Sequence, residues 1–598
     1  MKKIMKIVLL SVAAFALVFV APIVFPNKEN TATVESATAV KISKTTATMY
    51  VGGKALTLQI TGTKSTVTWT SSDRSVATVS NKGMVAAKKI GKTTITASVD
   101  GKKYECKVTV LAALPTTVKL DPSDASTFNN GKFQGWGTSF AWWANRIGYS
   151  DVMSEKAASL FYDSKNGLGL NIIRYNIGGG DNPLHNHITR TDSEVPGYLY
   201  WNDTTKKYEY DWDADYNQRN ALLKAIAVSD EDLIIEAFSN SPPYFMTNSG
   251  CSSGAEVGLD NNLREDSFDD FSEYLATVVL HYKNDLGISF QSISAMNEST
   301  SGWDAYSPKQ EGCHYDSGET QSNMLVELSK ALSAKGLADV IISGTDETNV
   351  DTQRSSYSAL SEKAKEVVGR IDTHTYTATD MARTKLNDLA EENKVNLWMS
   401  EVDGGSTIGT NSGEMGAGLW LGQQIISDMN GLKPSAWIMW QAIGNFFSTE
   451  GYNGNKDAAQ MVDKNKGFWG VAVADIDNND ILLTQKYYAF GQFTRYIRPG
   501  YTIISTNNSK SLAAYDKKSK TLVVVAINTK AAAEKYNFDL SMFKSFGSKV
   551  QVVRTSGTLE DGENWAELKA FSTTKSGFST EVKGFSITTF ILKDVVYK

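Results

Sequence analysis

The chain has 598 residues, and at about 150 residues per domain this length predicts several domains. Apolar residues make up 41% of the chain and charged residues 21%, which excludes wholesale disorder. A net charge of −6 without a basic block argues against nucleic acid as a partner, and three Cys and five His exclude a disulfide scaffold and a Cys-rich zinc module.

The first residues have the pattern of an export segment. Three lysines among the first six residues precede an uncharged apolar run over residues 7–25. This order predicts a signal peptide over residues 1–26; because the run is longer than a typical signal core, an uncleaved membrane anchor is the alternative. Residues 27–39 are small and polar and form a predicted linker. In either case we expect the remaining chain to be secreted or held at the cell surface.

Residues 40–112 contain short alternating strands separated by glycine-containing turns, the pattern of a small β-sandwich. The stretch VTWTSSDRSVATVSNKGMVAAKKIGKTTITASV within this range resembles the bacterial Ig-like domain of group 2. The resemblance implies a spacer or an adhesive module.

Residues 117–500 alternate between strand-like and helix-like segments. Eight such units predict an α/β fold, a (β/α)₈ TIM barrel, in which functional groups lie at the carboxyl ends of the strands. Residues 501–598 return to alternating strands and predict an associated C-terminal β-sandwich. The eight apolar runs of the barrel are Phe133–Trp142, Leu170–Ile177, Leu233–Phe238, Ser289–Met296, Val340–Gly344, Arg370–Tyr376, Val395–Ser400 and Ala436–Trp440.

Two glutamates follow strand-like runs directly, Glu298 after the fourth and Glu401 after the seventh. Two carboxyl groups at one rim can hydrolyse a glycosidic bond, because one protonates the leaving oxygen while the other, ionised, attacks the anomeric carbon. Asn297 precedes the first glutamate, where it could bind a sugar 2-hydroxyl. The alternative is that these acids only cap or turn the chain, as many acids at strand ends do.

Other strand ends supply polar and aromatic groups that suit a sugar. A cation such as Arg174 lowers the pKa of a nearby carboxylate, although a structural ion pair is the alternative. Tyr376 could donate a hydrogen bond to Glu401 or be a core residue, and His374 faces the rim only if the strand register allows it. Three tryptophans could stack on sugars or belong to the core: Trp142, Trp303 and Trp440.

Four further residues have to be weighed as ligands or cross-links. His185 and His187 form an H-x-H pair, but no convincing third ligand accompanies them, so we predict hydrogen bonding and no metal site. Cys251 and Cys313 follow the third and fourth runs, and an exported protein could join them in a disulfide.

Several motifs together resemble glycoside hydrolase family 30, of clan A: FQGWGTSFAWW, IIRYNIGGGDNP, EAFSNSPPYFM, SAMNE, WMSEVDGG and YYAFGQFTRYIRPG. The resemblance covers about residues 118–598. It implies that Glu298 is the general acid/base and Glu401 the nucleophile of a retaining hydrolase without a cofactor. It also implies that the segment just before the barrel joins the side β-sandwich.

The stretches SPKQEGCHYD and SNSPPYFMTNSGCSSG look like the endo-β-1,6-galactanase branch of that family. The implied partner is a polysaccharide or oligosaccharide, here the β-1,6-galactan side chains of arabinogalactan, and a monomer is the default expectation. Glucuronoxylanase is disfavoured, because no Arg occurs from Gln441 to Thr494 to hold a glucuronate. β-1,6-Glucanase, glucosylceramidase and a carbohydrate-binding surface protein without activity are the remaining alternatives.

Overall fold

The computed structural model describes residues 39–184, 188–190, 193–306, 310–404, 413–451 and 469–598. The predicted signal segment, most of the predicted linker and the pair His185 and His187 lie outside these residues. The chain divides into two compact units between Leu114 and Pro115. Within the described ranges, no helix combines the length and the apolar content that crossing a bilayer requires.

The first unit is the predicted small β-sandwich. Four strands form one sheet in the order β2-β9-β8-β5, three form another in the order β3-β7-β6, and β1 pairs with β4. Every second residue of β8 from Thr93 to Val99 is buried, as expected for a strand with one face on a core. The strands are β1 (Lys41–Ile42), β2 (Thr46–Tyr50), β3 (Leu56–Thr57), β4 (Ile60–Thr61), β5 (Thr68–Ser71), β6 (Ala77–Val79), β7 (Met84–Ala87), β8 (Gly91–Val99) and β9 (Lys102–Leu111).

The second unit contains the predicted barrel, closed by eight parallel strands that pair in chain order, with the last strand returning to the first. Each strand falls within or overlaps one predicted run, because strands covered on both faces consist of almost continuous apolar residues. The barrel strands are β11 (Gly135–Ser139), β12 (Ile172–Asn176), β15 (Ile234–Phe238), β16 (Ser292–Ser294), β17 (Ile341–Asn349), β18 (Val368–Thr377), β19 (Asn396–Glu401) and β20 (Ala436–Gln441).

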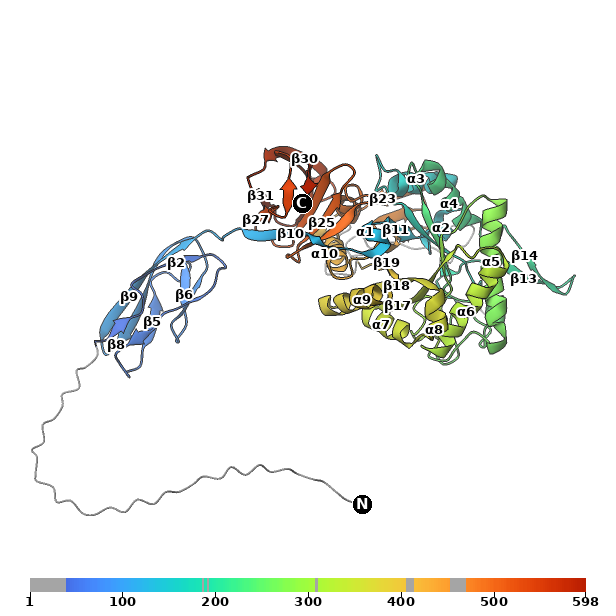
Figure 1. Cartoon of the computed structure of the whole chain (residues 1–598), viewed down its shortest axis with the longest axis horizontal. Coiled ribbons are helices and arrows are strands. Elements are labelled where there is room, and N and C mark those ends of the chain that lie inside the picture. Colours follow the sequence, from blue (N-terminus) through green and yellow to red (C-terminus); the bar gives the residue numbers. More distant parts are fainter. Residues whose placement is uncertain (1–38, 185–187, 191–192, 307–309, 405–412, 452–468) are drawn as a thin grey trace, which may run out of the picture. The chain divides into compact units, whose positions relative to one another are not determined.

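Helices cover the outside of the barrel (Figure 1). Several begin at a side chain that accepts a hydrogen bond from the first turn, such as Asn349 before α7 and Thr379 before α9. The helices between and after the strands are α2 (Trp143–Ile147), α3 (Asp151–Tyr162), α4 (Tyr216–Val228), α5 (Phe268–Asp285), α6 (Glu319–Ala334), α7 (Val350–Ala359), α8 (Glu362–Val367), α9 (Asp380–Asn393), α10 (Met415–Gly431) and α11 (Gln485–Thr494). A hairpin, β13 (Leu199–Asn202) and β14 (Lys207–Tyr210), follows the second barrel strand.

The predicted C-terminal β-sandwich is a nine-stranded sheet that curls around its own core. Its order is β30-β29-β32-β26-β25-β24-β10-β27-β31, so β10 (Thr116–Ala125) belongs to this sheet. The predicted barrel range 117–500 therefore begins too early. The other strands are β24 (Thr502–Thr506), β25 (Ser511–Asp516), β26 (Thr521–Asn528), β27 (Glu534–Asp539), β29 (Lys549–Ser556), β30 (Glu563–Ser572), β31 (Gly577–Val582) and β32 (Ser586–Leu592).

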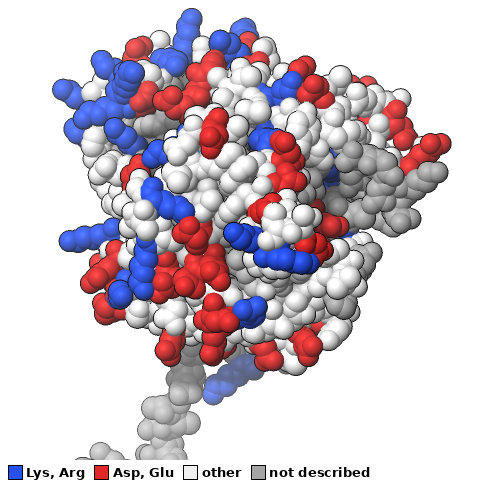
Figure 2. Space-filling view, turned by 90° about the vertical axis from the view of Figure 1, so that its right-hand side faces the viewer, with Lys and Arg blue, Asp and Glu red and all other residues white. Residues whose placement is uncertain are grey.

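The sheet is held against the barrel by α11, the last helix. Trp565 of β30 donates from Nε1 to the carbonyl oxygen of Tyr488 at 2.7 Å, and Thr589 of β32 donates to that of Gln492 at 2.8 Å. Barrel and sheet are thus one packed unit. On the face shown in Figure 2, Asp and Glu side chains gather over the lower half, with Lys and Arg interspersed among them.

Candidate active site

A pocket of about 480 Å³ opens at the carboxyl ends of the barrel strands. Seven of the nine predicted sugar-site residues line it, and Arg174 and His374 lie beneath it, buried in the barrel. The lining residues are Trp142, Arg190, Asn297, Glu298, Trp303, Gln310, Tyr376, Glu401, Trp440, Gln441, Gly444, Asn445 and Trp469.

Glu298 follows β16 at a sharp turn of the chain. Its φ is +47°, a left-handed conformation that costs a non-glycine residue on the order of 1 kcal/mol or more. Its N–H donates to the carbonyl oxygen of Asp346 at 2.7 Å, and its carbonyl oxygen accepts from Trp303 Nε1 at 3.2 Å. The backbone is therefore held on both sides of the side chain, which is 15% exposed toward the pocket.

Glu401 is the last residue of β19, and its side chain is only 4% exposed. One oxygen of Glu401 and one of Glu298 lie within 4.8 Å of each other. Retaining glycosidases hold their carboxyl groups about 5–5.5 Å apart, whereas inverting enzymes need about 6.5–9.5 Å. The spacing therefore fits direct attack on a sugar by one carboxylate and leaves no room for an intervening water.

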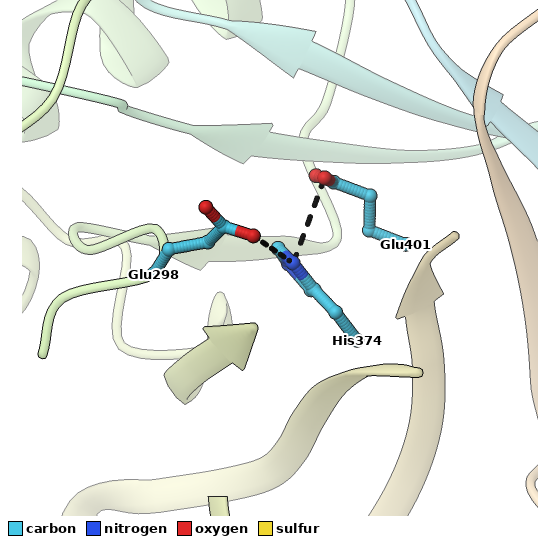
Figure 3. Close-up of side chains that lie close together, drawn as sticks. All are labelled: Glu298, His374 and Glu401. Carbon is cyan, nitrogen blue, oxygen red and sulfur yellow. Dashed lines mark hydrogen bonds and ion pairs between the residues drawn. The ribbon is translucent and has the colours of Figure 1, made fainter. Parts of the chain in front are cut away.

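His374, on β18, lies between the two glutamates (Figure 3). Its Nδ1 is 3.1 Å from Glu298 Oε1 and 3.5 Å from Glu401 Oε1, and its Nε2 is 3.2 Å from Asp346 Oδ1. Burial alone would lower the pKa of His374, but the carboxylates of Glu401 and Asp346 outweigh it and raise the pKa well above its usual value. The imidazole is therefore held in its cationic form among three carboxyl groups.

Arg174 is the second buried cation of the site. Its guanidinium bonds Glu401 Oε2 at 2.9 Å, Asp346 Oδ2 at 2.6 Å and Glu236 Oε1 at 3.3 Å, and it lies over the ring of Phe238. The predicted contact between this cation and the carboxylate at the end of the seventh strand is thus present.

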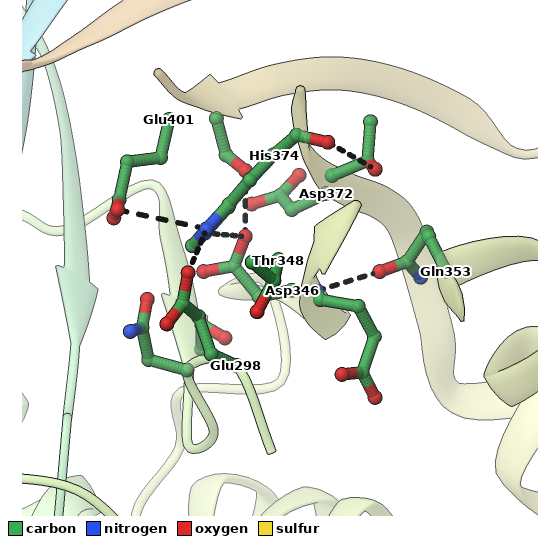
Figure 4. Close-up of polar contacts among 12 residues, drawn as sticks. Glu298, Asp346, Thr348, Gln353, Asp372, His374 and Glu401 are labelled. Atoms are coloured by element: carbon green, nitrogen blue, oxygen red, sulfur yellow. Dashed lines mark hydrogen bonds and ion pairs between the residues drawn. The ribbon is translucent and has the colours of Figure 1, made fainter. Parts of the chain in front are cut away.

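Asp346 links the two cations from the fifth strand (Figure 4). Burial would raise the pKa of Asp346, but Arg174 and His374 lower it to about 2. A permanently charged aspartate therefore stands behind the two glutamates. Sequence reasoning missed Asp346, although it comes two residues after the fifth apolar run and the strand-end rule used for the glutamates would have found it.

The pKa of Glu401 is raised by burial, and the neighbouring cations His374 and Arg174 oppose that effect. Tyr376 adds a hydrogen bond from its hydroxyl to Glu401 Oε1 at 2.9 Å. Each oxygen of Glu401 therefore has a donor, which favours the ionised form.

The same groups offer ligand atoms for a cation. Glu298, His374 and Glu401 each present one ligand atom, and these atoms lie within 4.8 Å of one another. A metal ion there would have to displace the proton that the carboxylates hold on His374.

Aromatic rings form the walls of the pocket. Trp142 and Trp440 are only 3% and 4% exposed and pack edge to face at 5.2 Å, so both are core residues that present an edge to the pocket. Arg190 lies 4.3 Å over the ring of Trp142 and covers that face, and Trp142 Nε1 has no acceptor among the described residues. On another wall, Trp469 stacks on Tyr376 at 5.7 Å.

Trp303 and Asn297 complete the set of predicted residues. The ring of Trp303 packs so closely on Gly312 that a Cβ at that position would lie 2.2 Å from it. Asn297 accepts weakly from Arg174, at 3.4 Å through Oδ1, and lines the pocket. Its amide nitrogen is thus oriented away from the cation.

The predicted disulfide is absent. Cys251 and Cys313 are both free, buried thiols. Each sulfur is oriented toward a carbonyl oxygen of its own loop, that of Ser249 at 3.6 Å and that of His314 at 3.8 Å. Two Cys in adjacent loops predicted proximity, but the sequence does not determine which way each side chain points.

Comparison with known proteins was made for both units. A family model described as O-glycosyl hydrolase family 30 matches residues 116–452, and one described as a bacterial Ig-like domain of group 2 matches residues 36–110. An endo-β-1,6-galactanase of Hypocrea rufa is 31% identical over 488 residues, which are 78% of this chain and 93% of the relative.

Two more distant similarities complete the comparison. An exo-β-1,6-galactobiohydrolase of Bifidobacterium longum subsp. longum is 24% identical over 69% of this chain, which spans only 34% of that protein. The crystal structure of a conserved exported protein from Bacteroides fragilis superposes with a TM-score of 0.63 at 19% identity, covering 80% of this chain and 100% of the other. At this identity the superposition shows a shared fold.

Proposed function

Because the chain belongs to glycoside hydrolase family 30, whose members are retaining hydrolases, we propose that it is an endo-β-1,6-galactanase acting on the side chains of arabinogalactan. The observation that carries the substrate assignment is the 31% identity to an endo-β-1,6-galactanase over 78% of the chain. The 4.8 Å approach of the carboxyl oxygens of Glu298 and Glu401 supports the double displacement.

In the first step, Glu401 attacks the anomeric carbon while Glu298 donates its proton to the glycosidic oxygen. The carbon–oxygen bond to the leaving sugar breaks, and a covalent glycosyl-enzyme forms on Glu401. Arg174 and Tyr376 each bond one oxygen of Glu401, which keeps its carboxylate oriented before attack and holds the freed oxygen afterwards.

In the second step, Glu298 removes a proton from water, and the resulting hydroxide attacks the anomeric carbon from the side the leaving sugar vacated. The bond to Glu401 breaks and the configuration is retained. Asn297 lines the pocket beside Glu298, where its amide can donate to the 2-hydroxyl of the sugar, a bond that strengthens in the transition state.

The substrate assignment is tested by incubating the purified protein with β-1,6-galactan, glucuronoxylan, β-1,6-glucan and glucosylceramide. We expect short β-1,6-galacto-oligosaccharides from the first substrate and little product from the others. Product from another substrate alone would overturn the substrate while leaving the double displacement in place.

The catalytic assignment is tested with Glu298→Gln and Glu401→Gln. Each is expected to lower kcat at least about 10⁴-fold with an unchanged circular dichroism spectrum, because each removes a group that takes part in bond breaking. A 2-fluoro-sugar should leave a mass-shifted adduct on Glu401. Glu362→Gln, on an exposed helix, is the matched control. Near-normal activity of either pocket variant would refute the assignment.

We also propose that the protein is exported and works as a monomer. The lysines and the apolar run at the start of the chain support export, and so does the Ig-like unit, a module of the kind found in surface proteins. Fractionation of the producing cells tests the first point, since recovery of the protein from the cytoplasm alone would contradict export. Sedimentation of the purified protein tests the second.

A further inference from the structure

A carboxylate that is not in the pocket contacts the loop that bears Glu298. The side chain of Glu347, on β17, is fully buried. Both of its oxygens accept hydrogen bonds, and all the donors are neutral. They are Ser299 Oγ at 3.1 Å, Gln321 Nε2 at 2.9 Å and Ser356 Oγ at 2.9 Å on Oε1, with Thr300 N–H at 3.2 Å and Thr300 Oγ1 at 2.7 Å on Oε2.

Ser299 and Thr300 are the two residues that directly follow Glu298. Glu298 itself has a left-handed backbone, which the chain does not adopt without support from its surroundings. The support comes from neighbouring residues of one strand: the carbonyl oxygen of Asp346 accepts from the N–H of Glu298 at 2.7 Å, and the carboxylate of Glu347 accepts from the next two residues.

The fifth strand therefore serves the site in two directions. The side chain of Asp346 bonds Arg174 and His374 behind the pocket. The side chain of Glu347 is instead bonded by Gln321 and Ser356, from α6 and α7 outside the barrel.

The strand itself is fixed by a third helix contact, because Gln353 Oε1 accepts from the backbone N–H of Glu347 at 2.8 Å (Figure 4). The loop of Glu298 is thus tied through Glu347 to rigid helices.

We infer that Glu347 is a positioning residue, which acts through Ser299 and Thr300 to hold Glu298 within reach of the glycosidic oxygen. The inference rests on the proposed role of Glu298 as general acid/base. Proton donation requires a heavy-atom distance of about 2.6–3.2 Å, so a loop that has lost its hold weakens this step first. Attack by Glu401, on another strand, does not depend on that loop.

The test variant is Glu347→Gln, which keeps the size of the side chain but turns an amide NH₂ toward the N–H and hydroxyl donors. It is assayed on a pair of aryl β-glycosides of the same sugar, one with a phenyl and one with a 2,4-dinitrophenyl leaving group, chosen from galactosides, galactobiosides, glucosides and xylosides that the wild type cleaves. The dinitrophenolate leaves without a proton, whereas phenolate needs one. We expect kcat on the phenyl glycoside to fall about 10–100-fold and kcat on the dinitrophenyl glycoside to stay within about 3-fold.

Asp215→Asn is the matched control. Asp215 is also fully buried and accepts from the neutral groups Tyr175 Oη, Tyr198 Oη and Gln218 Nε2, but it lies at the start of α4, away from the loop of Glu298. A variant that acts only on stability should change both leaving groups by the same factor.

Thr300→Val, which removes one donor to Glu347, provides a second measurement if Glu347→Gln does not fold. It should show the same leaving-group dependence at a smaller size. An equal loss on both substrates in the folded variants overturns the positioning role. Failure of β-1,6-galactan as a substrate would overturn only the proposed specificity, because the ratio is measured on whichever glycoside the wild type cleaves.

Discussion

Replacing Glu311 by glutamine is expected to stabilise the protein at alkaline pH and to leave it almost unchanged at pH 5. Glu311 is fully buried in the loop after the fourth barrel strand. Both hydrogen bonds described for its carboxyl group come from neutral donors, the N–H of Gly179 at 2.8 Å and Asn176 Nδ2 at 3.4 Å. Burial raises the pKa of Glu311 from its ordinary 4.5 to about 8, and these hydrogen bonds only partly oppose the rise.

The direction of the effect follows from linkage between proton binding and folding. Between pH 4.5 and 8 the folded protein keeps a proton on Glu311 that the unfolded chain releases. Stability is therefore complete below pH 4.5 and is lost as the pH rises through the folded value. At about 1.4 kcal/mol for each pH unit, the loss amounts to about 5 kcal/mol above pH 8.

A glutamine at position 311 stays neutral over this whole range. Its oxygen can accept from Gly179, and its NH₂ can donate to Asn176 Oδ1, which has no donor among the described residues. The assay is urea unfolding of the wild type and of Glu311→Gln from pH 5 to pH 9. We expect the two unfolding free energies to diverge by several kcal/mol toward pH 9. Glu362→Gln, whose side chain is 89% exposed, should follow the wild type. Parallel curves for all three proteins would refute the reasoning.

Two further predictions concern the contacts of the buried charges. Tyr376→Phe removes the 2.9 Å bond to Glu401, and since a hydrogen bond to a charged group contributes about 1.5–3 kcal/mol, kcat/KM on an aryl glycoside should fall about 10–150-fold, with Tyr216→Phe on the surface of α4 unaffected; a fall below threefold would contradict the contact. Acid unfolding should show the lowered pKa of Asp346: the wild type loses about 2 kcal/mol as the pH falls from about 4 to about 2, whereas Asp346→Asn, already destabilised at neutral pH, lacks this loss. An unchanged acid profile in the variant would rule out Asp346 as its source.

Much of the fold could be predicted from the sequence, because each barrel strand is buried on both faces and reads as a short apolar run. The period of the C-terminal strands changes to alternation, which marked the second sheet. The first strand of that sheet, β10, was assigned to the barrel range because it precedes the barrel in the chain and pairs with strands more than 380 residues further on.

The candidate site was only partly predictable. Glu298 and Glu401 stood out because the carboxyl ends of parallel strands meet at one rim, and the same rule would have indicated Asp346. Arg190 and Trp469 could not be found in this way, since they come from long loops whose course no local pattern determines. Glu347 was missed for a related reason: its partners lie in one loop and two helices, and none of them shares a motif with it.

The sequence by itself determined which segments become strands and helices and which acids end them, because these properties depend on neighbours a few positions away. Only the tertiary structure decided the chemistry of those acids. Arg174 and Glu401 are 227 positions apart in the chain and 2.9 Å apart in the barrel. Burial and neighbouring charges set the pKa of Glu401, His374 and Asp346, and both arise only when distant strands close into one barrel.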